Sequence, residues 1–236
     1  MRIVNRRNFL AAAGLAAGAA ALPLRVAAQA STAGARDRQL LEIAQRELAR
    51  AGNVLWRRDI VGIADFGLHS ALPRFHFANV ENGTVQSFRV AHGVGSDAEH
   101  DGWLKHYSNV PGSNATSRGA YITWEWYTGR YGTSVRLGGL DPDNSNTLER
   151  AIVMHAASYA TPQHVEKWGR LGRSNGCFAL SPDDFLVALG QLSGGRLLYA
   201  DTLGIAPDGS HVARPVTPAA PMPDYAATPG AEPPAA

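Results

Sequence analysis

The only thiol of this 236-residue chain, that of Cys177, stands at the end of a short polar segment suited to nucleophilic catalysis. Ser174, Asn175 and Gly176 precede it, and an apolar run begins at Phe178. A glycine before a nucleophile permits a tight turn and lets backbone N–H groups approach a carbonyl oxygen that becomes an oxyanion. The pattern predicts a nucleophilic cysteine with an oxyanion-binding turn, although a lone cysteine is more often a small buried hydrophobe.

A general base for this thiol is available in His155, which ends an apolar run that begins at Ala151. Eighteen residues separate His155 from Ser174. Cysteine catalysis needs an imidazole that takes the thiol proton, and the fold rather than sequence proximity brings the two groups together. We therefore expect His155 and Cys177 to be the catalytic pair, the alternative being an ordinary histidine at the end of a strand.

Further residues are candidates for a substrate-binding surface. Arg173 and Arg136 are possible anchors for a carboxylate, and Tyr159 follows His155 closely. His92 precedes a glycine, and Trp126 belongs to an aromatic run. The aromatic run also contains Tyr131, and its alternation suits cross-strand packing equally well. The spacing of His92, His100 and His106 matches no zinc motif, so we expect no metal.

The elements that must position these residues are mostly strands. Alternating apolar residues and turn signals predict strands at 59–66, 74–80, 84–90, 120–126, 133–137, 151–155 and 196–201, the second and third joined by an Asn82-Gly83 hairpin. Helical periodicity predicts a helix over 36–51, and a Ser181 cap predicts a second that ends near Leu192. The result is a mainly β domain with a leading helix and a short helix after the cysteine. Residues 93–118 form a loop long enough to suggest a function.

Composition and charge separate the two ends from the folded part. Residues 1–30 predict a cleaved export signal, with the twin-arginine pair Arg6-Arg7, an Ala/Gly/Leu stretch and a small-residue cleavage site at 28–30. Residues 31–54 are expected to be a helical segment, 55–211 the catalytic domain, and 212–236 a disordered Pro/Ala-rich tail. No other segment is long and apolar enough to cross a bilayer.

Net charge and cysteine content exclude several classes of protein. The formal charge is +2, from 22 basic and 20 acidic residues, but four of the arginines lie in residues 1–30. The remaining 18 basic residues against 20 acidic ones leave the expected mature chain slightly acidic, which argues against electrostatic binding of nucleic acid. A single cysteine permits neither an intramolecular disulfide nor a thiolate-rich metal site.

The order of His155 and the 174–177 segment resembles the signature of the YkuD-type L,D-transpeptidases, a histidine followed by Ser/Thr-His-Gly-Cys. The resemblance is closer to the branch known as the murein L,D-transpeptidase catalytic domain and spans about residues 55–201. Segments similar to that branch are 91–93, 108–113, 116–119, 127–140, 150–155 and 169–174. Two positions depart from the wider pattern, because Asn175 replaces the usual histidine and Ala179 replaces an arginine often found there.

This resemblance implies a YkuD-like β-sandwich or barrel and a cysteine acyltransferase of the cell wall that carbapenems target. His155 would deprotonate Cys177, and the thiolate would attack a donor stem peptide of peptidoglycan to form a thioester that an acceptor stem then resolves. It implies no cofactor, a monomer without a membrane span in its mature form, a periplasmic location and a role in cell-wall biogenesis and cell shape. The expected product is a 3–3 cross-link, with a 1–3 cross-link possible. The alternatives are an L,D-carboxypeptidase and a non-catalytic peptidoglycan-binding protein.

Overall fold

A computed structural model describes residues 34–213. The predicted export signal and nearly all of the predicted tail lie outside these residues. The helices are α1 (Ala35–Ala51), α2 (Pro162–Trp168) and α3 (Pro182–Leu192). The strands are β1 (Ile60–Asp65), β2 (Phe75–Asn79), β3 (Thr84–Phe88), β4 (Gly119–Gly129), β5 (Gly132–Gly139), β6 (Val153–Ala156), β7 (Phe178–Leu180) and β8 (Leu197–Asp201).

All eight strands belong to one mixed sheet in the order β3-β2-β1-β8-β4-β5-β6-β7. Two pairs, β1 with β8 and β6 with β7, are parallel, and the other pairs are antiparallel. Each strand predicted from the alternation of apolar residues is present within a few residues of its expected bounds. The prediction of a mainly β domain with a leading helix is therefore confirmed.

The sheet curls so that strands far apart in its order share one core. The register of β4 against β5 shifts between Thr123 and Trp126, a bulge that bends a strand. The ring of Phe178 on β7 lies 6.5 Å from that of Phe75 on β2, although five strands separate β2 and β7 in the sheet. An antiparallel bridge between Ala91 and Ala179 also joins the chain after β3 to β7. The two edges of the sheet therefore meet, as in a barrel.

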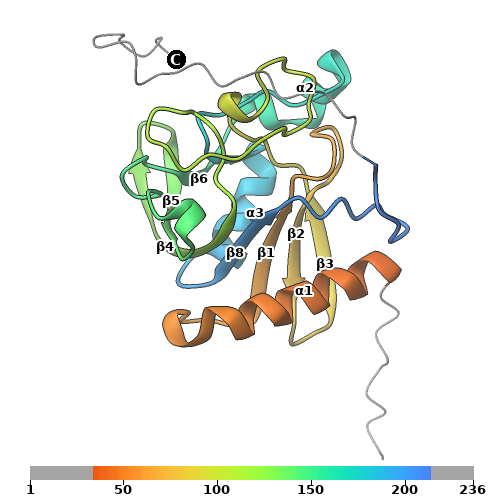
Figure 1. The fold of residues 1–236 in the computed structure, drawn as a ribbon, viewed down its shortest axis with the longest axis vertical. Helices are drawn as coiled ribbons and strands as arrows, with labels where there is room; N and C mark the ends of the chain where they lie inside the picture. The colour runs from red at the N-terminus through yellow and green to blue at the C-terminus, as the bar shows by residue number, and fades with distance from the viewer. Residues whose placement is uncertain (1–33, 214–236) are drawn as a thin grey trace, which may run out of the picture. The chain divides into compact units, whose positions relative to one another are not determined.

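The helices cover opposite faces of the sheet (Figure 1). α1 buries Leu40, Ala44 and Leu48 against one face, in a cluster that includes Val61 and Ile63 of β1. α3 lies inside the curl, and its buried residues Phe185, Ala188 and Leu192 pack into the other cluster. Burial of each large aliphatic or aromatic side chain contributes about 1.5–3 kcal/mol, so these two clusters hold the curled sheet together.

The two predicted helices begin and end as their signals indicate. α1 ends at Gly52, whose positive φ of 61° suits glycine. Ser181 caps α3 by accepting a hydrogen bond from the backbone N–H of Asp184, with Pro182 in the first turn. α2 is a helix that the periodicity did not predict, because its seven residues are too few to show a period. Its start does carry a signal, since Thr161 accepts from the N–H of His164 and Pro162 follows.

Within the described residues, no helix combines the length and the apolar character needed to cross a membrane.

Candidate active site

Pairing of β6 with β7 places His155 and Cys177 on one face of the sheet. The register sets His155 opposite Ala179, and Cys177 precedes Ala179 by two residues. Because side chains alternate between faces with a period of two, Cys177 lies on the same face as Ala179 and His155. Met154 and Phe178 point the other way, into the core inside the curl. The sheet thus brings together two residues that are 22 positions apart in the sequence.

The Cys177 thiol is held by backbone groups at the start of β6. Its Sγ lies 3.8 Å from the carbonyl oxygen of Ala151, which accepts from the S–H group, and the N–H of Val153 donates to the sulfur. Ala151 adopts a left-handed φ of 51°, rare for a residue with a Cβ. Burial raises the pKa of the Cys177 thiol, while the Val153 N–H and Arg150 act in the opposite direction. The resting group is therefore a thiol.

His155 is oriented as a base should be. Its Nδ1 lies 2.9 Å from the carbonyl oxygen of Ala156, and since a carbonyl can only accept, Nδ1 carries the proton and Nε2 carries the lone pair. The imidazole stacks on the ring of Tyr131, with centroids 4.7 Å apart and planes 20° apart. Burial lowers the pKa of His155, so the ring is neutral at pH 7 and able to accept a proton. Among the described residues, no hydrogen bond joins His155 and Cys177 directly.

The turn at 174–177 is built around the Ser174 hydroxyl. Its Oγ donates to the carbonyl of Cys177 at 2.6 Å and accepts from the N–H of Gly176 at 3.2 Å. Gly176 has a φ of 109°, which a side chain would strain. The backbone N–H groups of Asn175, Gly176 and Cys177 are the candidates for an oxyanion site, and that of Gly176 is therefore already occupied. No acceptor within residues 34–213 takes the N–H of Asn175 or Cys177, so those two are available to a ligand.

Two of the predicted substrate-binding residues lie around this face. Tyr159 follows β6, and its pKa is raised by burial and by the nearby Cys177 and Tyr131. Arg136 on β5 stands opposite Val153 and so shares the face of His155; it pairs with Glu125 at 2.8 Å and stacks over Tyr127. Trp126 on β4 is 60% exposed but stands opposite Val135, whose partner is Met154, and so lies on the other face of the sheet.

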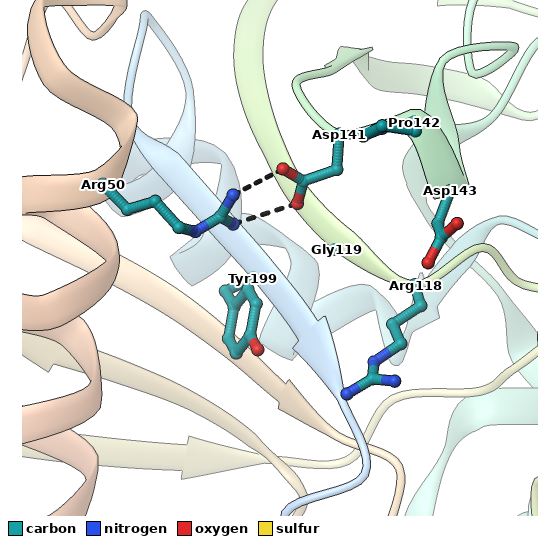
Figure 2. A pocket seen from close by; sticks show the side chains of 7 residues that line it. All are labelled: Arg50, Arg118, Gly119, Asp141, Pro142, Asp143 and Tyr199. Carbon is teal, nitrogen blue, oxygen red and sulfur yellow. Dashed lines mark hydrogen bonds and ion pairs between the residues drawn. The ribbon is translucent and has the colours of Figure 1, made fainter.

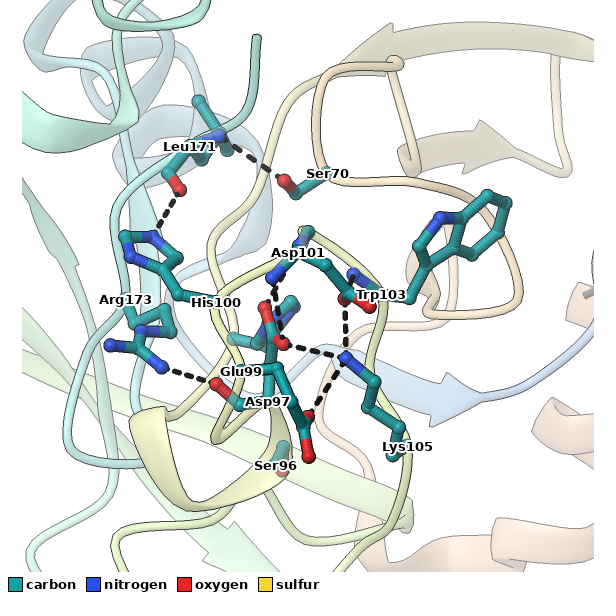
Figure 3. Close-up of polar contacts among 12 residues, drawn as sticks. Ser70, Ser96, Asp97, Glu99, His100, Asp101, Trp103, Lys105, Leu171 and Arg173 are labelled. Atoms are coloured by element: carbon teal, nitrogen blue, oxygen red, sulfur yellow. Dashed lines mark hydrogen bonds and ion pairs between the residues drawn. The ribbon is translucent and has the colours of Figure 1, made fainter. Parts of the chain in front are cut away.

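Two others belong to a polar region around Asp97: Arg173, which Figure 3 shows, and His92, which bonds to Asp97. His92 is buried, with Nδ1 accepting from Arg74 at 2.7 Å and Nε2 donating to Asp97 at 3.2 Å, so neither ring nitrogen is free for a ligand. Arg173 donates to the backbone carbonyls of Asp97 and Ala98. These contacts tie the start of the 93–118 loop to the segment that leads into Ser174, and Ser174 N–H itself donates to the His92 carbonyl at 2.9 Å.

Asp97 is the centre of this region, and we call Arg74, His92, Asp97 and Lys105 the Asp97 network. The buried carboxylate accepts from His92, from Lys105 at 2.9 Å and from the backbone N–H groups of Asp101 and Gly102. These donors hold its pKa below the ordinary value despite burial, whereas burial lowers the pKa of His92 to about 4. Every charged group in the network has a partner, which is typical of structural polar clusters.

Two residues of the site were not among the sequence candidates for catalysis. Tyr131 appeared only as part of the aromatic run, and its position at the β4–β5 turn over His155 could not be known without the pairing of β5 with β6. Arg150 was not selected at all. Its guanidinium lies beside Gly176, since a Cβ on Gly176 would be 3.2 Å from Arg150 Nη2. Its only signal was a place at the start of the segment that ends with His155.

A pocket of about 330 Å³ lies elsewhere on the surface (Figure 2). Arg50, Arg118, Gly119, Asp141, Pro142, Asp143 and Tyr199 line it. Arg50 pairs with Asp141 through both of its terminal nitrogens, and Arg118 pairs with Asp201 at 2.8 Å. Neither Cys177 nor His155 lines this pocket, and its arginines are already neutralised, so it offers no comparable chemistry. Among residues 34–213, no group of three or more His, Cys, Asp or Glu side chains is placed to hold a metal ion.

The fold and the His–Cys pair agree with a match of residues 35–200 to the family model described as the L,D-transpeptidase catalytic domain. The chain belongs to this family. The match covers the site, the whole sheet apart from the last residue of β8, and all three helices. It confirms the resemblance noted in the sequence.

The solved structures that the chain matches include L,D-transpeptidases and a cell-shape protein, all at low identity. An L,D-transpeptidase from Mycobacterium smegmatis is 16% identical, with a TM-score of 0.37, covering 61% of this chain and 58% of that one. L,D-transpeptidase 3 from Mycobacterium tuberculosis is 13% identical, with a TM-score of 0.39, covering 61% and 60%. The helical cell shape determining protein Pgp2 from Campylobacter jejuni is 12% identical, with a TM-score of 0.38, covering 67% and 55%. The chain thus spans less than two thirds of each; no curated protein matched.

Proposed function

We propose that this protein is a cysteine L,D-transpeptidase that acts on peptidoglycan stem peptides through a thioester acyl-enzyme. The observation that carries the proposal is the arrangement of His155 and Cys177 on one face of the β6–β7 pair, with the lone pair of Nε2 free and the thiol held by the Ala151 carbonyl. The twin-arginine leader in the sequence supports a periplasmic location.

The neutral resting pair favours a mechanism in which proton transfer accompanies attack. Nε2 of His155 takes the thiol proton, and the sulfur of Cys177 bonds to the carbonyl carbon of an L-configured residue in the donor stem. The electron pair of the C=O bond moves to oxygen, where the N–H groups of Asn175 and Cys177 are the available donors. The tetrahedral intermediate then collapses and expels the amine of the following D-residue, which receives the proton from the imidazolium.

The second half of the reaction reverses these roles. An amine of an acceptor stem attacks the thioester carbon while His155 accepts its proton, a new amide bond forms, and the C–S bond breaks to release the thiolate. The energy of the cleaved amide is retained in the thioester, so the reaction requires no metal or nucleotide. A 3–3 cross-link results when the acyl donor is the L-centre of the third residue, and a 1–3 cross-link when it is the first residue.

A carbapenem tests the nucleophile directly, because attack by Cys177 on the lactam carbonyl leaves a stable acyl-enzyme. We expect the intact mass of the purified protein to rise by one drug molecule, and peptide mapping to place the adduct on Cys177. Cys177→Ala is the matched control and should gain no mass. A protein whose thiol is titratable by a disulfide reagent but which gains no adduct would contradict the proposal.

The reaction product is identified by treating isolated cell wall with the wild-type or Cys177→Ala protein and then digesting the wall. New cross-linked dimers, sequenced by tandem mass spectrometry, support the transpeptidase and assign the linkage as 3–3 or 1–3. Shortened monomeric stems alone would instead identify an L,D-carboxypeptidase that delivers the acyl group to water. Binding to the wall by both proteins, with no change in its peptides, would identify a non-catalytic binding protein.

A further inference from the structure

Arg150 presents a half-buried guanidinium to the 174–177 turn, held by four neutral acceptors. Its Nη1 donates to the carbonyl of Ser108 at 2.7 Å and to the hydroxyl of Ser117. Its Nη2 donates to the carbonyl of Ala115 and to the hydroxyl of Ser113 at 3.3 Å. These contacts give both terminal nitrogens of the guanidinium two acceptors each without cancelling its charge.

Arg150 has no acidic partner, which it shares with the buried Arg74 but not with three other arginines of the described chain. Arg50, Arg118 and Arg196 each pair with an aspartate, at Asp141, Asp201 and Asp59. No carboxylate within residues 34–213 lies within 4 Å of Arg150. A half-buried cation without an anion is costly, and unlike Arg74 this one lies beside the 174–177 turn, where an anion forms in the proposed reaction.

That anion is the sulfur of Cys177. Nη2 of Arg150 approaches Gly176 closely, as a Cβ there would lie 3.2 Å from it, and Gly176 adjoins Cys177. Besides Arg150, the groups that face the thiol are the Ala151 carbonyl, the Val153 N–H, His155 on the same face and the Tyr159 phenol. At pH 7 the last two are neutral, since burial lowers the pKa of His155 and raises that of Tyr159. Arg150 alone of this set carries a permanent charge.

We propose that Arg150 is a positioning residue that holds the 174–177 turn in place and supplies the positive charge that stabilises Cys177 as a thiolate. The role of this charge in acyl transfer rests on the proposed function, but its effect on the ionisation of the thiol does not. The same charge favours the tetrahedral intermediate, whose oxygen becomes anionic beside the turn. Arg150 also links the long 108–117 segment to the nucleophile, which gives that part of the predicted functional loop a purpose.

Alkylation of Cys177 by iodoacetamide at varied pH measures this effect without a cell-wall substrate. The thiolate sulfur displaces iodide, so a C–S bond forms, the C–I bond breaks and the rate follows the thiolate fraction. Arg150→Gln keeps an amide donor for the Ala115 carbonyl and removes the charge. Because a cation lowers the pKa of a neighbouring thiol, we expect the midpoint to move up by about one pH unit and the rate at pH 7 to fall about tenfold.

Two further variants separate charge from folding. Arg150→Lys keeps the charge but loses part of the hydrogen bonding, and its pH profile should superimpose on that of wild type. Arg118→Gln removes the same charge from an arginine that is paired with Asp201 and lies outside the site; it should leave the profile unchanged. Circular dichroism and thermal melting establish that each variant is folded.

The outcomes decide the inference in either case. A folded Arg150→Gln protein with the wild-type midpoint overturns it, as does an Arg150→Lys midpoint that rises by half a unit or more. Should Arg150→Gln fail to fold, the lysine variant alone decides by the same criterion. A wild-type protein that is alkylated as expected but forms no carbapenem adduct would refute the proposed function while leaving the role of Arg150 intact.

Discussion

The Asp97 network and the site around Cys177 each contain a buried histidine and an arginine, yet the two histidines differ in their hydrogen bonding. In the network, both nitrogens of His92 are bonded and Lys105 pairs with the Asp97 carboxylate, while Arg74 donates to His92 and to backbone carbonyls. In the site, His155 uses only Nδ1, and Arg150 faces neutral acceptors. Two bonded ring nitrogens indicate a histidine that holds the fold, whereas one unused lone pair indicates a histidine that can accept a proton.

Exchanging a histidine in each region should separate these roles most strongly. His155→Gln removes the base, and we expect the rate of carbapenem acylation to fall about 10³-fold, since general-base catalysis contributes roughly 10²–10⁴. His92→Gln should leave the rate per folded molecule within about threefold of wild type while lowering the melting temperature. Stopped-flow acylation and calorimetry measure the two effects. A His92 variant as inactive as the His155 variant would place His92 in the catalytic machinery.

A substitution at Asp97, the centre of the Asp97 network, should have a smaller effect than the loss of His155. Its effect should appear in the free energy of unfolding. Asp97→Asn removes the charged acceptor of His92, of two backbone N–H groups and of Lys105, which keeps Glu99 and Asp101 as partners, and we expect a loss of about 2 kcal/mol in the free energy of unfolding. The pKa of Asp97 is lower in the folded state, so its contribution is present above the unfolded value of about 3.9 and is lost as pH falls through the folded value.

The titration of His92 also lowers the stability of the protein as pH falls, but over a higher range of pH. Its folded pKa of about 4 lies below the unfolded value of about 6.5, so the unfolded state binds the proton first as pH falls. Denaturant titrations should therefore show wild type losing stability between pH 6.5 and 4, and Asp97→Asn losing less on further acidification. Equal acid sensitivity of the two proteins below pH 4 would show that Asp97 is not the group responsible.

The smallest expected effect concerns Tyr131, which only supports the base. Tyr131→Leu removes a stacking contact worth about 1 kcal/mol, so acylation should slow about fivefold. Tyr131→Phe keeps the ring and serves as the control, with a rate indistinguishable from wild type. If the phenylalanine variant slows as much as the leucine variant, the hydroxyl rather than the stacked ring supports catalysis.

The parts of this molecule that could be predicted from the sequence are those with local signals. The periodicity of 36–51, the Ser181 cap and the Asn82-Gly83 turn are each contained within a few residues, and the elements appear where they indicate. His155 and Cys177 were recognisable as candidates because thiol chemistry needs both residue types. Their placement on one face of adjoining strands bears on that prediction without testing the reaction.

What could not be predicted depends on contacts between distant segments. Arg150 meets the carbonyl of Ser108 across 42 residues and the Gly176 turn across 26, and nothing local distinguishes it from the arginines that pair with aspartates. The sequence offers His92 as a candidate for substrate binding because it precedes a glycine, but the fold buries it between Arg74 and Asp97. α2 is too short for periodicity to reveal, so only its Thr161-Pro162 start pointed to it.

Phe178, immediately after the nucleophile, has a consequence for motion. Its ring contacts those of Phe66, Phe75 and Tyr121, with centroids 6.0, 6.5 and 5.4 Å away. A fluctuation that displaces the 174–177 turn must therefore separate the rings of this central aromatic cluster. Core clusters of this kind are among the last parts of a domain to unfold. The turn therefore cannot open locally at a low cost in free energy. Cys177 is expected to keep its position for as long as the domain remains folded.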